Sequence, residues 1–354
     1  MSFAIVGCGR IGKRHAELLA SGSIAGAQLV AVCDLNEERA SAFSTDYGCP
    51  SFLTINEMIS EAKPTVVIIC TPSGDHAESS VIAARHGCHV VVEKPMALTL
   101  VDADRMILAC AENQVKLFVV KQNRFNLPIQ KLYAVVSSGR LGKITLGTIR
   151  VRWCRPDSYY EQDAWRGTWL QDGGVLANQA SHHIDALEWM MGEVDSVYAI
   201  SKTFLADIEV EDTALAILRF KSGALGLIEA TTATRPRDLE GSLSILGEFG
   251  TIEVAGIALN HLRTWELSTA EKDDPEDLAQ FSENPPDVYG FGHRRYLEHV
   301  VDCIENDKNQ LVDGFEGRKS LELINAIYES IETSKEVNLR FVPKHSKLGG
   351  NDDS

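Results

Sequence analysis

The stretch DGGVLANQASHHIDALEW, residues 172–189, concentrates side chains that could move a proton. Asn178 lies four residues before His182, and Asp185 follows three residues after it. On a helix these three share one stripe, because side chains three or four residues apart lie on the same face. An imidazole supported by a carboxylate suits general acid or base catalysis near neutral pH. The stretch therefore predicts an acid–base centre on a helix that begins just after the Gly-Gly pair.

Two other interpretations of this polar stripe stay open. One is a surface helix with incidental histidines, and the other is a metal site made of His182, His183 and Asp185. The metal site is disfavoured because adjacent helical residues point about 100° apart and no further ligand cluster accompanies them. We therefore predict no bound metal. The apolar residues 180, 184, 187 and 191 form the opposite stripe, which we expect to face the core.

The N-terminal residues carry a phosphate-binding signature. The apolar run FAIV leads into G-x-G-x-x-G at Gly7, Gly9 and Gly12, and a helical pattern follows. The first glycine permits a tight turn, the second lets backbone approach a pyrophosphate, and the third lets the helix pack on the strand. The anion would lie at the helix N-terminus. We predict a dinucleotide-binding turn that includes Arg10 and Ile11.

The acid that follows the second apolar run favours NAD. QLVAVCDLN ends in Asp34, 22 residues after Gly12, followed by Leu35 and Asn36. A carboxylate here accepts hydrogen bonds from the adenosine ribose and repels a 2′-phosphate. No arginine follows at once to bind such a phosphate. NAD is therefore the predicted cofactor.

Apolar strands and helical patterns alternate over residues 65–122, which predicts a parallel sheet covered on both faces. The strands are expected at 65–70, 88–93 and 116–122, and the helices at 76–87 and 99–113. Ligands bind such sheets beyond the carboxyl ends of the strands. The expected cofactor contacts there are Thr71, Pro72, Ser73, His76, Glu93, Lys94 and Gln122. Lys94, between an acid and a proline, is also expected to act on the substrate.

From about residue 124 the strands become longer and alternate between polar and apolar residues. This period of two predicts a mainly antiparallel sheet with one buried face, whose open face could serve as an oligomer contact. The acidic segment 271–288 is expected to be a loop. Helices near 291–306 and 317–333 and a strand near 337–342 complete the pattern.

The fold class is therefore α/β. We expect a Rossmann domain with a doubly wound parallel sheet at 1–122, and a substrate-binding and oligomerisation α/β domain with a large open-faced sheet at 123–342. Residues 343–354 form a polar tail that we expect to be disordered.

Composition favours a small-molecule partner. With 34 lysines and arginines against 50 aspartates and glutamates, the 354-residue chain carries a net charge of −16, which repels nucleic acid and anionic membranes. The eight cysteines show no paired spacing, which is typical of a reducing compartment. Neither a signal peptide nor a run of membrane-spanning length is apparent. We expect a cytoplasmic protein.

Together, the motifs resemble a known family. G-x-G-x-x-G, TPSGDH, EKP and GG-x-x-x-N-x-x-x-H-x-x-D occur in this order along the chain, as in the Gfo/Idh/MocA sugar oxidoreductases. More narrowly, VVKQNRFN, RPDSYYEQDAWRGTW, NQASHHID, VEDTA, LEGSLSILGEFGTIEV and VYGFGH resemble the UDP-N-acetyl-glucosaminuronate 3-dehydrogenases of bacterial surface-polysaccharide biosynthesis, including O-antigen.

This resemblance implies NAD-dependent oxidation of a C3 hydroxyl on a nucleotide sugar, and a tetramer formed through the open sheet. It also implies that Lys94 and His182 handle the proton, and which of them is the base stays open. Many polyol-oxidising members carry aspartate where this chain has Asn178, which disfavours an inositol dehydrogenase. We expect Asn178 to orient the hydroxyl group and Asp185 to support His182.

A nucleotide sugar with a uronate brings several negative charges, which calls for local arginines. Arg166 is the first candidate and Arg124 the second, with Tyr160, Trp165 and Gln179 as further substrate contacts. Arg155, Arg235 and Arg237 are weaker candidates, and Tyr159 could also offer a ring face.

Two alternatives remain: a dehydrogenase of a free sugar or polyol, and an NAD-binding sensor without turnover. In some relatives of the subgroup a 2-oxo acid re-oxidises bound NADH, and the sequence leaves open whether this chain takes such a second substrate.

Overall fold

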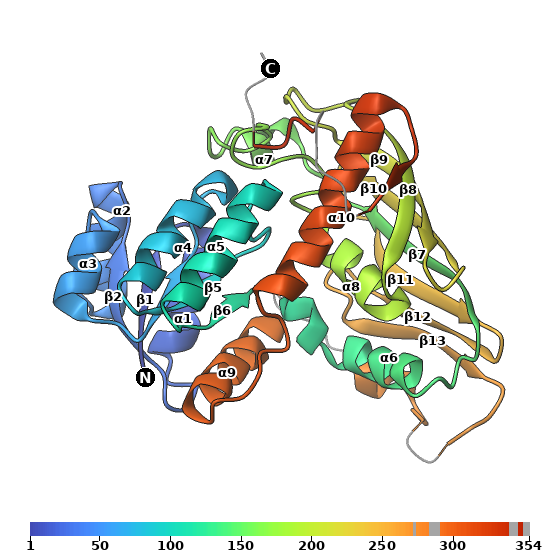
Figure 1. The fold of residues 1–354 in the computed structure, drawn as a ribbon, viewed down its shortest axis with the longest axis horizontal. Coiled ribbons are helices and arrows are strands. Elements are labelled where there is room, and N and C mark those ends of the chain that lie inside the picture. The colour runs from blue at the N-terminus through green and yellow to red at the C-terminus, as the bar shows by residue number, and fades with distance from the viewer. Residues whose placement is uncertain (272–273, 283–290, 340–345, 350–354) are drawn as a thin grey trace. The chain divides into compact units, whose positions relative to one another are not determined.

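A computed structural model describes residues 1–271, 274–282, 291–339 and 346–349 (Figure 1). The chain forms two compact units. Met1–Lys121 joins His293–Leu321 in the first unit, and Gln122–Gly292 joins Glu322–Ser354 in the second. The predicted domain boundary between residues 122 and 123 stays a prediction. The contacts within the structure also assign residues 293–321 to the first unit.

The first unit is built on a parallel sheet with the strand order β3-β2-β1-β4-β5-β6. Its strands are β1 (Ser2–Val6), β2 (Gln28–Cys33), β3 (Ser51–Phe52), β4 (Val66–Ile69), β5 (His89–Val92) and β6 (Leu117–Val119). Its helices are α1 (Arg10–Ala20), α2 (Glu37–Tyr47), α3 (Ile55–Ala62), η1 (Ser73–Asp75), α4 (His76–Arg85), α5 (Leu100–Glu112), α9 (Gly292–Glu305) and the first part of α10 (Gly314–Thr333).

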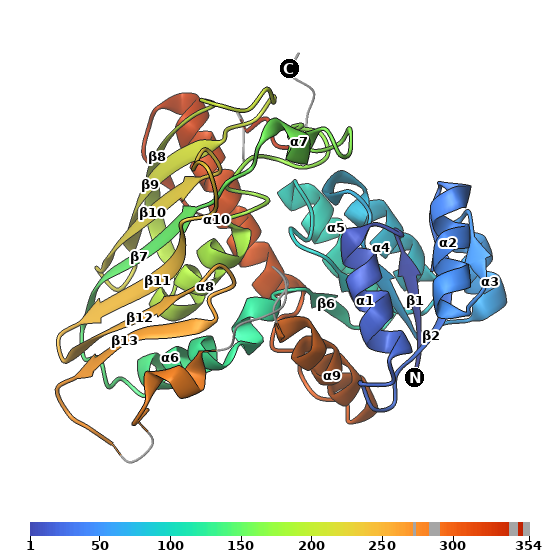
Figure 2. The same ribbon diagram turned by 180° about the vertical axis from the view of Figure 1, so that it is seen from behind.

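Helices cover both faces of this sheet. Figures 1 and 2 show α4 and α5 on one face and α1 on the other. For that reason β4, with the sequence VVII, is buried at every position. Because the strands are parallel, the carboxyl ends of β1, β2, β4 and β5 lie at the same edge of the sheet. The predicted cofactor-binding turns follow these strands there.

The second unit contains a mixed sheet in the order β13-β12-β11-β7-β10-β9-β8-β14, in which β7 and β10 are parallel and the other neighbours antiparallel. Its strands are β7 (Ile144–Arg152), β8 (Val194–Lys202), β9 (Thr213–Phe220), β10 (Leu225–Thr231), β11 (Glu240–Gly247), β12 (Gly250–Ala255), β13 (His261–Leu267) and β14 (Val337–Asn338). The remaining elements are η2 (Gln122–Phe125), α6 (Leu127–Ser137), α7 (Asp157–Tyr160), α8 (Ser181–Met191), η3 (Leu278–Phe281) and the C-terminal part of α10.

Strand β9 shows how this sheet separates two environments. Its residues alternate between buried and exposed along TALAILRF, because α8 and its neighbours cover only one face. The outer face of β8, β9 and β10 exposes large apolar side chains, namely Tyr198, Ile200, Leu215, Ile217, Leu225 and Leu227. An apolar surface of this kind is typical of an interaction site.

The predicted α/β class, with a parallel and a mainly antiparallel sheet, is confirmed. The sequence interpretation did not include α2, α3 and α6. The strand predicted at 337–342 is seen as Val337–Asn338, and residues 340–342 lie outside the described residues. Of the predicted loop 271–288, residues 278–281 form η3, and 272–273 and 283–288 are outside the description.

The polar tail is described only at residues 346–349. There Leu348 is buried, and the tail's other residues, 343–345 and 350–354, lie outside the described part. Among the described residues no helix combines the length and the apolar character needed to cross a membrane.

Candidate active site

The glycine-rich turn between β1 and α1 has the shape that a pyrophosphate needs. Gly7 has φ +100°, and a Cβ there would lie 2.5 Å from the carbonyl oxygen of Cys70. A Cβ at Gly12 would collide with the carbonyl group of Gly7, whereas the space beside Gly9 is open. No acidic residue lies in the first turn of α1, so the positive end of the helix dipole is not neutralised there.

Asp34 connects the end of β2 to this turn. Its Oδ2 accepts a hydrogen bond from the backbone N–H of Cys8 at 2.8 Å, and its Oδ1 accepts one from Asn36 at 2.8 Å. Each carboxylate oxygen can accept more than one hydrogen bond, so the adenosine ribose can still bind. The turn, the helix N-terminus and this carboxylate together fit NAD.

Lys94 follows β5 and rests on a buried carboxylate. Glu93 Oε2 accepts a hydrogen bond from the backbone N–H of Lys94 at 3.1 Å, and Glu93 Oε1 lies 2.8 Å from His15 Nε2. His293 Nε2 lies 3.8 Å from the same Oε1 atom. One ring nitrogen from each histidine and one carboxylate oxygen of Glu93 lie within 4.8 Å of one another.

The environment of Glu93 keeps it charged. Burial alone would raise its pKa, but the hydrogen bonds from His15 and His293 hold the pKa well below its usual range. Burial lowers the pKa of His15, so this ring is neutral and donates its Nε2 proton to the carboxylate. Glu93 therefore acts as a fixed negative anchor for the main chain at Lys94.

His76 links the turns that follow β4 and β5. Its Nδ1 is 2.8 Å from the carbonyl oxygen of Pro95, and its Nε2 is 3.0 Å from that of Thr71. The ring is buried, so it contacts main chain on both sides. Its predicted contact with the cofactor stays a prediction, and the structure adds a role in holding the two turns together.

The helix with the second predicted cluster begins later than expected. We expected it to start just after the Gly-Gly pair, but α8 begins at Ser181, and Asn178 lies in the turn that precedes it. Asn178 Nδ2 donates a hydrogen bond to Asp172 Oδ1, which holds this turn in a non-helical path. The four apolar residues expected in the core, 180, 184, 187 and 191, are buried.

His182 contacts a residue from the start of the second unit. Its Nε2 lies 3.1 Å from the side-chain nitrogen of Gln122 in η2. Because an amide N–H donates, Nε2 accepts and holds its lone pair, with the ring proton on Nδ1. This tautomer suits a base. The sequence interpretation placed Gln122 with the cofactor and missed its contact with His182.

Asp185 forms a buried ion pair with Arg124. The Arg124 Nε and Nη2 atoms donate to its two oxygens at 2.8 and 2.9 Å, and both side chains are at most 4% exposed. The guanidinium carbon also lies 4.8 Å from the ring centroid of Trp189, which stacks on Tyr133. Arg124 and Asp185 thus fasten η2 to α8. Support of His182 by Asp185 and substrate binding by Arg124 stay predictions.

The segment around α7 holds the other predicted substrate residues. Arg166 donates to Asp163 at 3.3 Å and to the Tyr159 hydroxyl at 2.7 Å, and its guanidinium lies 4.6 Å from the Trp165 ring. The Tyr160 hydroxyl is 3.2 Å from the Thr232 hydroxyl. Arg166 is therefore held in place by neighbours that leave some of its five N–H donors for a ligand.

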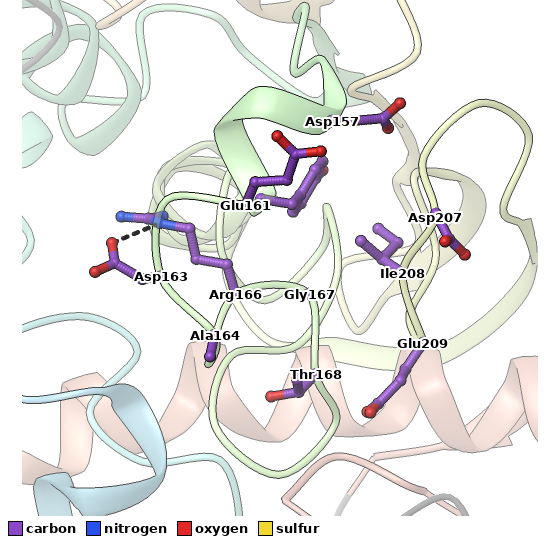
Figure 3. Close-up of a pocket in the computed structure, with 11 residues that line it drawn as sticks. Asp157, Glu161, Asp163, Ala164, Arg166, Gly167, Thr168, Asp207, Ile208 and Glu209 are labelled. Carbon is purple, nitrogen blue, oxygen red and sulfur yellow. Dashed lines mark hydrogen bonds and ion pairs between the residues drawn. The ribbon is translucent and has the colours of Figure 1, made fainter.

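A cavity of about 590 Å³ lies beside Arg166, and Figure 3 shows residues that line it. Five carboxylates line it, those of Asp157, Glu161, Asp163, Asp207 and Glu209. This excess of acid does not suit a ligand with several negative charges.

The weaker arginine candidates and Gln179 occupy different surroundings. Arg155 donates to Asp238 at 3.0 Å, Arg235 donates to main-chain carbonyl groups, Arg237 is exposed, and Gln179 is buried.

The first unit thus has the turn geometry of a dinucleotide-dependent oxidoreductase, and the second unit brings an imidazole base candidate on a sheet-backed helix. Comparison with known proteins agrees with this class. Residues 1–121 match the family model for the NAD-binding Rossmann fold of the Gfo/Idh/MocA oxidoreductases, and residues 134–339 match the model for their C-terminal alpha/beta domain. The chain belongs to this family.

Individual relatives indicate the kind of substrate that this family member oxidises. The myo-inositol 2-dehydrogenase of Thermotoga maritima is 31% identical over 97% of this chain and 99% of its own length. The crystal structure of the WlbA dehydrogenase from Bordetella pertussis, in complex with NADH and UDP-GlcNAcA, is 41% identical with a TM-score of 0.92, over 96% of this chain and 98% of that one. The corresponding complex from Chromobacterium violaceum is 39% identical with a TM-score of 0.91, over 96% of both chains. This chain is an NAD-dependent dehydrogenase of sugars or polyols.

Proposed function

We propose that this enzyme oxidises the C3 hydroxyl of UDP-N-acetyl-glucosaminuronate (UDP-GlcNAcA) to a 3-keto sugar, in the cytoplasm, for a bacterial surface polysaccharide. The observation that carries the proposal is the 41% identity to a dehydrogenase crystallised with NADH and UDP-GlcNAcA. The identity to the inositol dehydrogenase is lower, at 31%. Asn178, where many polyol-oxidising members have aspartate, also favours the nucleotide sugar.

The proposed chemistry assigns one task to each side chain. Bound NAD supplies the acceptor for the hydrogen and the two electrons that leave the oxidised carbon. His182 removes the hydroxyl proton through Nε2, the atom that accepts a hydrogen bond from Gln122 in the structure. Lys94 stabilises the developing negative charge on the oxygen, and Asn178 orients the hydroxyl group.

Binding of the diphosphate and the uronate requires cations in an acidic protein. We propose Arg166 as the first of them, with Trp165, Tyr160 and Gln179 at the sugar or the uracil. Arg166 is ordered by Asp163 and Tyr159 before any ligand arrives, which reduces the entropic cost of binding.

A second candidate function is oxidation of a free sugar or polyol. The 31% identity to the inositol dehydrogenase favours it, and so does the acidic cavity beside Arg166, which suits an uncharged ligand better than a nucleotide sugar.

The deciding experiment is isothermal titration of the purified full chain with UDP-GlcNAcA and, separately, with myo-inositol. NAD is present, and nicotinamide absorbance is followed in parallel, with and without an added 2-oxo acid. Tight binding of UDP-GlcNAcA with reduction of NAD supports the proposal. Turnover of myo-inositol alone favours the second candidate. Binding of NAD without turnover of either compound would overturn both proposed substrates and leave the fold and the cofactor standing.

We also propose that the apolar face of β8, β9 and β10 joins copies of the chain into a tetramer. Its exposed Ile217 and Leu227 lie directly opposite each other on paired strands. Replacement of Ile217 by aspartate should dissociate the assembly in light scattering after gel filtration, whereas an unchanged mass would disprove this interface.

A further inference from the structure

Glu211, in the VEDTA segment before β9, is buried and lies beneath the turn that precedes α8. Its side chain is 4% exposed. Its Oε1 accepts hydrogen bonds from the backbone N–H of Leu176 at 3.0 Å and from the Tyr328 hydroxyl at 2.9 Å. Its main-chain oxygen accepts one from the N–H of Val175 at 3.0 Å. Glu211 therefore holds two consecutive residues of this turn.

Tyr328, in α10, holds the residue before them. Its hydroxyl oxygen accepts a hydrogen bond from the N–H of Gly174 at 3.1 Å while donating to Glu211. A Cβ on Gly174 would collide with the carboxyl group of Glu211, so only glycine fits. The N–H groups of three successive residues, 174–176, thus donate to Glu211 or Tyr328. The closeness of the Glu211 carboxyl group explains why the second residue of the Gly-Gly pair is glycine.

Further hydrogen bonds connect this turn to the proposed catalytic residues. The N–H of Asn178 donates to the carbonyl of Gly174 at 3.0 Å, and the N–H of Ala180 donates to that of Val175 at 2.7 Å. The Ser181 hydroxyl, on the first residue of α8, donates to the carbonyl of Asn178 at 3.1 Å. His182 follows directly. Any shift of the Gly174–Leu176 backbone therefore moves Asn178 and His182 as well.

The second carboxyl oxygen of Glu211 has different surroundings. Among the described residues, Oε2 has no hydrogen-bond partner, and it is buried against Gly174. The titratable groups that face Glu211 are Tyr328 from α10 and Asp172 from the preceding loop. Burial, with a smaller contribution from Asp172, raises the pKa of Glu211 to about 7. A protonated carboxyl group places no charge in this buried space, whereas an ionised one does.

We propose that Glu211, in its protonated form, is a positioning residue that fixes the Gly174–Leu176 turn and thereby places Asn178 and His182 for catalysis. This inference rests on the proposed function, which makes those two residues part of the catalytic machinery. Ionisation of Glu211 puts an uncompensated negative charge beside Gly174 and Asp172 and loosens the turn.

The test compares Glu211→Gln with wild type across pH 6 to 8.5, a range chosen to bracket the pKa of about 7. Glutamine keeps an acceptor for Leu176 and Tyr328 and cannot ionise. The ratio of kcat/KM, variant over wild type, should stay near one at pH 6 and rise roughly threefold or more by pH 8.5. Any ionisation that affects both proteins equally cancels in the ratio. A flat ratio in an active enzyme overturns the proposal.

Glu266→Gln is the matched control. This exposed glutamate lies in β13, the strand at one edge of the sheet, and does not line the cavity beside Arg166. Its ratio should stay flat with pH, and a slope equal to that of Glu211→Gln would also overturn the proposal.

Hydrogen–deuterium exchange separates this inference from the proposed function, because it needs no turnover. Peptides that cover residues 173–182 should lose protection in wild type above pH 7, relative to Glu211→Gln at the same pH. If Glu211→Gln fails to fold, Tyr328→Phe replaces it and should lower protection of the same peptides at every pH. Protection equal to wild type above pH 7 in Glu211→Gln, or at every pH in Tyr328→Phe, overturns the proposal, even if no substrate is ever turned over.

Discussion

The turn at Lys94 and the turn before α8 each rest on a buried glutamate, but the two carboxyl groups have opposite environments. Glu93 in the first unit faces two imidazoles, which hold its pKa well below the usual range. Glu211 in the second unit accepts hydrogen bonds from a tyrosine hydroxyl and a backbone N–H. Burial raises its pKa to about 7. Burial is nearly complete at both sites.

The difference shows that burial does not decide the charge of a carboxyl group by itself. Removal from water always favours the protonated form, and only hydrogen bonds from strong donors or nearby positive charge can outweigh it. Imidazoles provide this at Glu93. Hydrogen bonds from Tyr328 and from backbone amides do not outweigh burial at Glu211, where Asp172 also raises the pKa.

The largest expected effects test whether both turns carry catalysis. Lys94→Met and His182→Gln should each lower kcat/KM by about 10²–10⁴-fold, because each removes a proposed proton-handling group. NAD affinity, measured by titration, should change little in His182→Gln and fall modestly in Lys94→Met, because Lys94 is also a predicted cofactor contact. The exposed His86→Asn is the control and should keep wild-type turnover. Near-wild-type activity in either catalytic variant would disprove its assignment.

The next test removes the charge at Glu93. Glu93→Gln should destabilise the protein by about 1.5–3 kcal/mol at pH 7, because the imidazoles lose a charged hydrogen-bond acceptor. Since the folded pKa of Glu93 lies below the unfolded value, its contribution is present above pH 4.5 and is lost as pH falls through the folded pKa. The deficit in unfolding free energy, measured in urea, should therefore be constant from pH 6 to 8 and shrink in acid. A deficit that instead grew in acid would contradict the charged state of Glu93.

Glu211→Gln should act on stability in the opposite direction. The folded pKa of about 7 lies above the unfolded value of 4.5. The stability that protonated Glu211 contributes is therefore fully present below pH 4.5 and is lost as pH rises through 7. The variant avoids this loss and should be more stable than wild type by up to about 3 kcal/mol at pH 8.5, with little difference at pH 5. Thermal unfolding at both pH values measures this difference in stability. Equal midpoints for the variant and wild type at pH 8.5 would contradict the raised pKa of Glu211 and its contrast with Glu93.

The smallest effect concerns Asp34, which has hydrogen bonds from two backbone groups and is partly exposed. Asp34→Ala should weaken NAD binding by about tenfold and reduce discrimination against NADP, because a charged acceptor for the ribose is lost. Titration with both nucleotides measures this. Unchanged affinity for NAD and unchanged preference would disprove the cofactor contact.

Much of the fold could be predicted because its signals are local. The run TVVIIC is short and rich in β-branched residues, which favours a buried strand, and β4 lies within it. Glycines 7, 9 and 12 stand where a strand turns into a helix, and the spacing alone gives each a steric reason. The start of α8 was predicted too early, because the hydrogen bonds that hold residues 174–178 out of a helix come from Glu211, Tyr328 and Asp172, which the local pattern does not include.

The sequence by itself determined the α/β class, the NAD-binding turn and the residue types available for proton transfer, since these depend on neighbours along the chain. Only the tertiary structure decided which partner each side chain has: Arg124 for Asp185 and Gln122 for His182, about sixty residues apart. The same is true of Glu93 with His15, and of Glu211 with Tyr328. The physical reason is that these hydrogen bonds reach only about 3 Å, and the backbone path alone decides which distant side chains come that close.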